Sequence, residues 1–381
     1  MNVFREAARV LNNAFVKEWK ASGKKVVGYT CSYVPDEVLH AGGILPYRLR
    51  GFGAEGMTIG DTYFGPFICS LPKCMLQLAG QGDFDFLDGA IITPGCDSMR
   101  RIDECWRTMA ADAKAHMPPF FFHFGVPHKY ADFTVAWFKQ EILRLIRAIE
   151  GHFASRIDDD RLKESIRLYN RTRSLMSRLE GYRSADEPRI TGADTLAVAL
   201  ASTAMQREKY ADMLEQFLAR LERDAPAIRG RRRLMLVGSA SDDVELMRLI
   251  EGERALVVAD TICFGSRAQA NLVEEAGDPI EALSRRYLSL FDCPRMYGRY
   301  EQRLESIAAR AEQAKVDGVI LQNIRFCDLH GAENGLLERD LEAKGIPCLR
   351  LEREYGQLVE SGRMKMRIDA FLERLAQERP Q

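Results

Sequence analysis

The sequence lacks the short motifs that often assign a function directly. It contains no C-x-x-C pair, so a zinc ribbon or a ferredoxin-type cluster run is poorly supported. It has no G-x-x-x-x-G-K-[ST] phosphate loop and no G-x-S-x-G nucleophile elbow. The segment GFGAEG at 51–56 matches a dinucleotide fingerprint, but Gly60 and Pro66 stand where the helix should begin. Neither an ATP site nor a dinucleotide site is therefore expected.

The sequence also lacks an excess of charge and long apolar runs. Its 381 residues carry 54 Lys and Arg against 55 Asp and Glu, a formal net charge of −1, which gives no reason to expect nucleic acid or an acidic membrane as a partner. No apolar run approaches the roughly 20 residues that span a bilayer. The first 25 residues lack a secretory h-region and have helical spacing of apolar residues, which predicts a leading amphipathic helix. We expect a cytoplasmic protein without a nucleic-acid or membrane partner.

Cysteine, by contrast, is abundant, with nine residues in the chain. The cytoplasm keeps thiols reduced, so a disulfide framework is not expected there. If these cysteines have a shared purpose, it is metal binding or redox chemistry.

The pattern of apolar segments predicts an α/β fold with two doubly wound, Rossmann-like parallel-sheet domains. Short apolar runs alternate with helical patterns in both halves, as is typical of strands joined by crossover helices. We expect an N-terminal α/β domain at 1–130, a helical connector at 131–230 and a C-terminal α/β domain at 231–381, with the site in the crevice between the sheets. The predicted strands are KKVVGYT, GILPYRL, FLDGAIITP and PFFFHFGVP in the first half, and RLMLVGS, ALVVADTI, DGVILQNI and PCLRLERE in the second.

Several cysteines fall where these strands end. Ligands of open α/β sheets bind beyond the carboxyl ends of the strands. Four predicted strand exits carry a cysteine, namely Cys31, Cys96, Cys263 and Cys327. Cys69 and Cys293 lie in Pro-containing segments from which a thiol can project towards the same crevice. These six residues are the candidate ligands, against the alternative that they are six ordinary buried cysteines.

The other three cysteines fit that ordinary interpretation. Cys74 and Cys105 lie in helical patterns, and Cys348 lies inside a predicted strand. Single thiolates from separate strand ends would form a cavity site, which suits an iron-sulfur cluster because no local spacing is needed.

Four arginines lie close in sequence to the candidate ligands. Positive charge beside a thiol lowers its pKa and would tune the potential of a cluster. The four are Arg100, Arg101, Arg267 and Arg325. Surface solvation is the alternative for each of them.

The cysteine segments, taken with their neighbours, resemble the 2-hydroxyacyl-CoA dehydratase and benzoyl-CoA reductase superfamily, over about residues 24–375. The segments that carry the resemblance are GYTCSYVPDEVLHAGGILPYRLRG, FICSLPKCMLQLAGQGDFDFLDGAIITPGCDSMRR, VADTICFGSR, DCPRMYGR and NIRFCDLHGAENGLLERDLEAKGIPCLRLEREY, followed by GRMKMRIDAFLE.

The resemblance implies an iron-sulfur component that receives low-potential electrons from a separate ATP-hydrolysing iron-sulfur activator protein. By motif, the cluster ligands of the dehydratase and reductase subunits correspond to Cys69, Cys96 and Cys327. The further presence of Cys31, Cys263 and Cys293 resembles the homodimeric double-cubane cluster branch, in which two 4Fe-4S cubanes share a bridging sulfide. That branch implies a reductase component for small-molecule substrates, with these six cysteines as metal ligands.

Two functional alternatives stay open. One is a subunit of a 2-hydroxyacyl-CoA dehydratase or benzoyl-CoA-type reductase with a single 4Fe-4S cluster, and the other is a non-catalytic iron-sulfur or zinc protein. Glu37 and His330 lie near cluster cysteines in sequence and are the candidate proton carriers, although a structural hydrogen-bonding role is the alternative for each.

Overall fold

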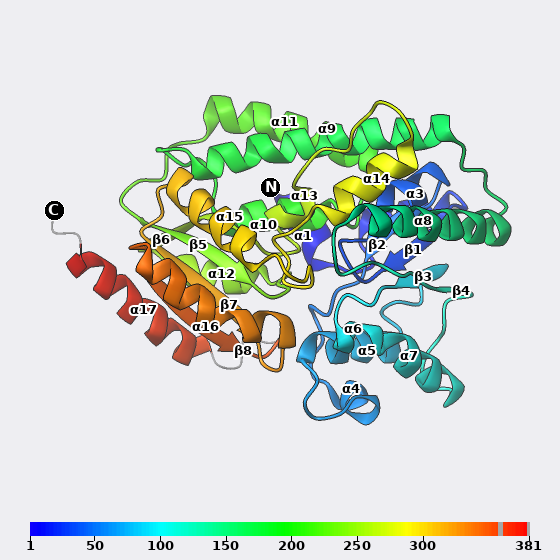
Figure 1. Ribbon diagram of the computed structural model, residues 1–381, viewed down its shortest axis with the longest axis horizontal. Coiled ribbons are helices and arrows are strands. Elements are labelled where there is room, and N and C mark those ends of the chain that lie inside the picture. Colours follow the sequence, from blue (N-terminus) through cyan, green and yellow to red (C-terminus); the bar gives the residue numbers. More distant parts are fainter. Residues whose placement is uncertain (357–360, 379–381) are drawn as a thin grey trace.

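The computed structural model of the chain describes residues 1–356 and 361–378 (Figure 1). It contains two four-stranded sheets in which all the pairings are parallel. The first sheet has the order β2-β1-β3-β4 and the second β6-β5-β7-β8. The predicted α/β fold with two parallel sheets is therefore confirmed. The strands are β1 (Val26–Tyr29), β2 (Leu45–Arg48), β3 (Gly89–Ile92), β4 (Phe120–His123), β5 (Arg232–Gly238), β6 (Ala255–Asp260), β7 (Gly318–Ile324) and β8 (Cys348–Arg353).

Most strands are largely buried, which explains their apolar sequences. Every residue of β1, β3, β6 and β7 is buried. In the first half, short helices precede or connect the strands: α1 (Asn2–Arg9), α2 (Ala14–Ala21), α3 (Asp36–Ala41), α4 (Thr58–Tyr63), α5 (Ser70–Gln81), α6 (Asp97–Arg100) and α7 (Ile102–Ala111). In the second half they are α12 (Val244–Glu251), α13 (Ser266–Gln269), α14 (Pro279–Leu288), α15 (Tyr300–Gln313), α16 (Asp328–Ala343) and α17 (Ser361–Glu378).

Helices occupy the stretch between the two sheets in sequence. They are α8 (Asp132–Phe153), α9 (Asp159–Ser184), α10 (Gly192–Ala201) and α11 (Arg207–Asp224). In Figure 1, α9 and α11 run side by side along one edge of the molecule. The long helix α9 contacts α3 from the first half and β6 from the second. It therefore connects the two sheet-containing halves.

Two of the predicted helical segments are interrupted. The leading segment is two helices. The first, α1, ends at Arg9, and Asn13 caps α2 by accepting from the backbone N–H groups of Phe15 and Val16. The apolar segment from 194 to 222 is also two helices, α10 and α11, separated by residues 202–206. Among the described residues, no helix is long and apolar enough to cross a membrane.

Candidate functional site

Four of the six candidate thiols, Cys31, Cys96, Cys263 and Cys327, follow the carboxyl ends of β1, β3, β6 and β7, and the other two lie between helices. Cys31 follows β1, Cys263 follows β6, and Cys293 lies in the turn-rich segment between α14 and α15. The remaining three, Cys69, Cys96 and Cys327, are the N-cap residues of α5, α6 and α16. Cys69 therefore starts a 12-residue helix and is not a simple loop residue. All six are free thiols.

Cys69, Cys96 and Cys327 form what we call the N-cap triad. Backbone N–H groups of the first helical turns favour the thiolate form of these sulfur atoms, those of Leu71 at Cys69, of Met99 at Cys96, and of Leu329 and His330 at Cys327, although none of the three side chains makes a capping hydrogen bond. A helix N-terminus carries partial positive charge, which favours a thiolate. The three residues thus share one local solution to holding a negative sulfur atom.

Electrostatic interactions connect the members of the N-cap triad although they come from both halves of the chain. Cys69 interacts with Cys327, and Cys96 interacts with both. Two hydroxyl groups add support, since Ser98 donates to Cys69 and Ser239, which follows β5, donates to Cys327. The three thiols are therefore neighbours although they come from both halves.

Cys31, Cys263 and Cys293 form a second group, the arginine triad. Arg48 on β2 donates to the Cys263 backbone carbonyl, and its Nη2 lies 3.2 Å from the Cys263 Sγ. Arg267 also donates to the Cys263 thiol and interacts with Cys293. Cys31 interacts with Cys293 as well as with Cys96, so the two triads are neighbours.

The thiol pKa values follow these surroundings. Burial raises the pKa of Cys69 to about 12, and it also raises the pKa of Cys31, Cys96 and Cys327. Burial acts in the same direction on Cys263, but Arg48 and Arg267 outweigh it and hold its pKa below the ordinary value. Thiols bind metal as thiolates, so most of these groups would gain their charge only when a metal site supplies the compensating positive charge.

The donor set fits an iron-sulfur cluster better than a single ion. Within the described ranges, no three His, Cys, Asp or Glu side chains are grouped closely enough to hold one metal ion. A mononuclear zinc site needs about four ligands at about 2.3 Å or less from one point. Cluster ligands instead bind separate iron atoms, so six soft thiols spread around a crevice are a suitable set.

The predicted arginines contribute unequally. Arg267 is 3% exposed and contacts the arginine triad. Arg100 and Arg101 instead pair with Asp97, and Arg325 pairs with glutamates of β8 and the segment after it. For these three the structure favours the surface alternative.

Sequence reasoning missed Arg48 and Arg295. Arg295 is 2% exposed, interacts with Cys31, and donates to the backbone carbonyls of Gly95, Val126 and Pro127. Arg48 is also buried, in a strand of otherwise apolar and aromatic residues. A charged residue within a buried strand was the available signal for Arg48.

Glu37 is enclosed rather than open to the crevice. Its side chain is 0% exposed, and its two oxygens accept from Arg173 and from the Tyr287 hydroxyl. Burial raises its pKa, but Arg173 and Arg286 outweigh this and lower it overall. Glu37 is thus a charged partner in a buried network, and its role as a proton carrier stays a prediction.

His330 lies in the first turn of α16, near Cys327. The residue is 7% exposed, and burial together with Arg267 and Arg303 holds its pKa well below the ordinary value. The ring is neutral at physiological pH in these surroundings. Its role as a proton carrier also stays a prediction.

An aromatic pair joins the two halves beside the N-cap triad. Phe67 and Phe326 pack edge to face, with ring centroids 5.6 Å apart, although they are 76% and 43% exposed. Phe326 has a φ of +62°, a left-handed conformation that is strained for a bulky residue. Phe67 lies shortly before Cys69 in the sequence, and Phe326 lies directly before Cys327.

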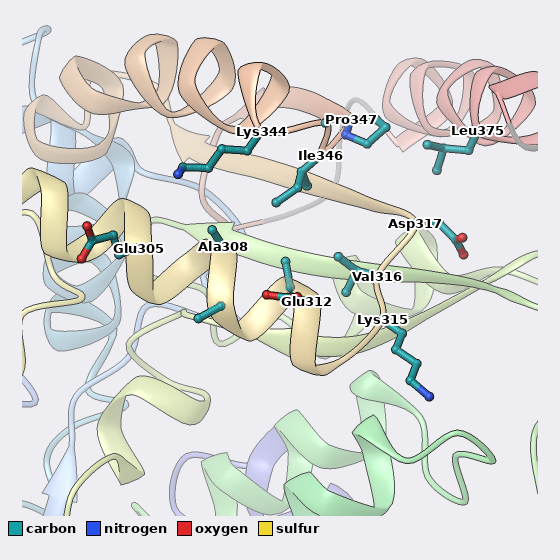
Figure 2. A pocket seen from close by; sticks show the side chains of 13 residues that line it. Glu305, Ala308, Glu312, Lys315, Val316, Asp317, Lys344, Ile346, Pro347 and Leu375 are labelled. Carbon is teal, nitrogen blue, oxygen red and sulfur yellow. The ribbon is translucent and has the colours of Figure 1, made fainter.

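A cavity of about 910 Å³ lies elsewhere, at the amino ends of β7 and β8. Figure 2 shows Glu305 and Glu312 along α15 on one side of it and Lys344 and Ile346 on the other. Parallel sheets bind ligands at their carboxyl ends, and no candidate cysteine lines this cavity. We therefore place the candidate site at the thiols and not in this cavity.

The comparison with known proteins covers most of the chain. The family model described as 2-hydroxyglutaryl-CoA dehydratase, D-component, matches residues 31–375. The (R)-phenyllactyl-CoA dehydratase beta subunit of Clostridium sporogenes is 24% identical over 375 residues, 98% of this chain and 98% of that protein. A benzoyl-CoA reductase subunit of Thauera aromatica is 28% identical over 336 residues, 86% of this chain and 84% of that protein. The (R)-2-hydroxyglutaryl-CoA dehydratase subunit beta of Acidaminococcus fermentans is 24% identical over 372 residues, 94% of each chain.

Proposed function

From the premise that the chain belongs to the 2-hydroxyglutaryl-CoA dehydratase D-component family, we propose that it is the iron-sulfur component of an ATP-dependent, low-potential reductase system. In this proposal the chain carries a double-cubane cluster and reduces small molecules. A separate ATP-hydrolysing iron-sulfur activator supplies the electrons, and the chain acts as a homodimer.

The observation that carries the proposal is the number and arrangement of the thiols. Six cysteines from both halves form two neighbouring groups of three, the N-cap triad and the arginine triad. A single 4Fe-4S cluster would leave the arginine triad without a ligand role. Two bridged cubanes would use both groups.

The chain's own residues hold and balance charge at this site. Two guanidinium groups act on the Cys263 sulfur, while serine hydroxyls and the backbone N–H groups of the first helical turns favour the thiolate form of the N-cap triad. Such contacts stabilise thiolate charge and tune the potential of a bound cluster. The cluster, when bound, would supply the electron storage, and the protein would supply access, electrostatics and protons.

The alternative is a subunit of a 2-hydroxyacyl-CoA dehydratase or benzoyl-CoA-type reductase with one 4Fe-4S cluster on the N-cap triad. It is favoured by the relatives, whose names describe dehydratase subunits and a benzoyl-CoA reductase subunit. Under this alternative the chain would need a second, different subunit. Cys31, Cys263 and Cys293 would then be packing residues without a role as cluster ligands.

Iron and acid-labile sulfide per chain, measured on anaerobically purified protein, test the two proposals. Two cubanes' worth of iron, with sulfide slightly exceeding iron, is expected for the double cubane. Replacing Cys263 by Ala should then lower the iron content, whereas Cys105→Ala, a buried thiol of α7, should not. One cubane's worth, unchanged in Cys263→Ala, would support the alternative. No iron or sulfide after reconstitution would contradict both.

The partner is tested separately. Mixed with an ATP-hydrolysing iron-sulfur activator, the loaded protein should show cluster reduction that requires ATP, followed by electron paramagnetic resonance. Sizing of the active species should show a homodimer. Activity only after addition of a second, non-identical family subunit would contradict the homodimer.

A further inference from the structure

A second polar cavity lies apart from the thiols. It has a volume of about 30 Å³ and lies where β1 and β2 end against α9, α11, α13 and α14. No cysteine lines it. The side chain of Arg48 lines this cavity and also contacts Cys263.

Positive charge exceeds negative charge around this cavity. Four buried arginines line it, together with one carboxylate, that of Asp36. The four are Arg48, Arg173, Arg207 and Arg286, each at most 6% exposed. Two of them have carboxylate partners: Arg173 pairs with Glu37, and Arg207 lies 3.1 Å from an Asp36 oxygen.

The other two have no carboxylate partner within the described parts of the chain. Arg286 donates to the backbone carbonyls of Ala268, Ala270 and Asn271, and Arg48 donates to Cys263. Arg286 interacts with Glu37 and Asp36 at longer range, but these carboxylates already pair with Arg173 and Arg207, so a positive charge stays in excess. A buried charge without a counter-ion is costly.

Two lining arginines also have unused hydrogen-bond donors. The Nε atoms of Arg48 and Arg207 are buried and have no acceptor among the described residues. Buried donors in native proteins nearly always have a partner, which is water or an ion when the protein supplies none. Donors together with uncompensated positive charge favour an anion over water.

From this geometry we propose that the cavity binds one small monovalent anion of halide size, held by Arg48 and Arg207 and balancing the charge of Arg286. The volume corresponds to about two water molecules. This inference does not depend on the presence of a cluster.

Diffraction at the bromide absorption edge tests the proposal on the full-length, anaerobically purified protein. In crystals grown with bromide as the sole halide, we expect an anomalous peak between the side chains of Arg48 and Arg207. Water density without an anomalous peak in the cavity would overturn the proposal. This measurement needs no variant.

Thermal melting provides a test in solution. At equal ionic strength, sodium bromide should raise the Tm relative to sodium gluconate by about 2 °C or more, and the rise should saturate with bromide concentration. Arg286→Gln removes the uncompensated charge and should abolish this saturable rise. Arg171→Gln, an exposed arginine on α9, should retain it. A bromide effect of the same size in Arg286→Gln as in the natural protein would overturn the proposal.

Discussion

At the scale of single residues, the contact between Arg173 and Glu37 is an ion pair with almost no access to water, since the two side chains are 4% and 0% exposed. Removing one partner of a buried pair leaves the other charge uncompensated. We expect Arg173→Met to lower the free energy of unfolding by about 3–5 kcal/mol in urea titrations.

The matched control is two residues away on the same helix. Arg171 pairs with Asp212 and Glu215 on the surface, where all three side chains are at least 42% exposed. Arg171→Met should therefore cost less than about 1 kcal/mol. If the two variants lose the same free energy of unfolding, burial does not determine how much these ion pairs stabilise the fold.

Asp88 gives a prediction on pH dependence. Burial raises its pKa, but Lys20, the Val26 backbone N–H and Lys25 outweigh burial and hold the pKa below 3.8. A carboxylate whose pKa is lower in the folded state stabilises the fold above pH 3.8, and this contribution is lost as the pH falls through the folded-state pKa.

In urea titrations of metal-free protein, Asp88→Asn should therefore be less stable than the natural chain at pH 7, by about 1 kcal/mol because the ion pairs are partly exposed. The difference should shrink as the pH is lowered below 3.8. A difference that is constant from pH 7 to pH 3 would contradict the role given to this carboxylate.

Sequence reasoning succeeded for residues placed by a local pattern. Four of the candidate thiols, Cys31, Cys96, Cys263 and Cys327, were placed correctly at strand ends because those ends are visible in the sequence, whereas Cys69 and Cys293 were selected from Pro-containing segments. Arg48 and Arg295 were not identified, because they reach thiols far away in the chain: Arg48 and Cys263 are 215 residues apart. No local spacing reports such a contact. The ligand role of the six thiols itself stays a prediction.

At the scale of secondary-structure elements, the end of β5 depends on one glycine. Gly238 has a φ of +146°, and a Cβ built there would lie 1.8 Å from the backbone oxygen of Gln322 in β7. Ser239, the next residue, donates to Cys327, so this close approach also positions a group of the candidate site.

Gly238→Ala should lower the free energy of unfolding by at least about 3 kcal/mol, because both the backbone conformation and the neighbouring strand resist the added methyl group. Gly230→Ala is the control, since Gly230 also has a positive φ of +72° but no atom within 4 Å of an added Cβ. The control should lose about 1–2 kcal/mol. Urea unfolding of both variants distinguishes this steric account from one based on φ alone.

All eight predicted strands are present, because buried parallel strands are continuous apolar runs in the sequence. Helix ends were less predictable. The segment from 194 to 222 has helical spacing of apolar residues throughout, yet α10 ends at Ala201 and α11 begins at Arg207. The break lets Ser202 and Thr203 donate to carbonyls of the preceding turn and places both beside the cavity that is proposed to bind an anion. Tertiary packing, which the local pattern does not contain, decides such breaks.

At the scale of the whole molecule, the two sheets have the same strand order, with the first strand of each half between the second and third. Each triad draws cysteines from both halves: Cys31 joins Cys263 and Cys293, while Cys69 and Cys96 join Cys327. In the proposed function, the cluster therefore holds the two halves together. The helix α9 does so independently through α3 and β6.

Removal of iron should consequently loosen both halves at the same time. With a chelator, amide hydrogen exchange should accelerate in the first turns of α5 and of α16, whose N–H groups face the thiols. The first turn of α14, capped by Asp278 instead, should be unaffected. Acceleration confined to one half would contradict a cluster shared between them.

The division of each triad between the two halves also affects the order of events during synthesis. A ribosome releases Cys31, Cys69 and Cys96 early, in a segment that contains none of their second-half partners. The arginine triad is complete only after Cys293 has been made, and the N-cap triad only after Cys327. A nascent chain therefore exposes three thiols for most of its translation without being able to assemble the proposed site. If a cluster with these ligands is inserted, the insertion can be completed only after the segment that carries Cys327 has been made.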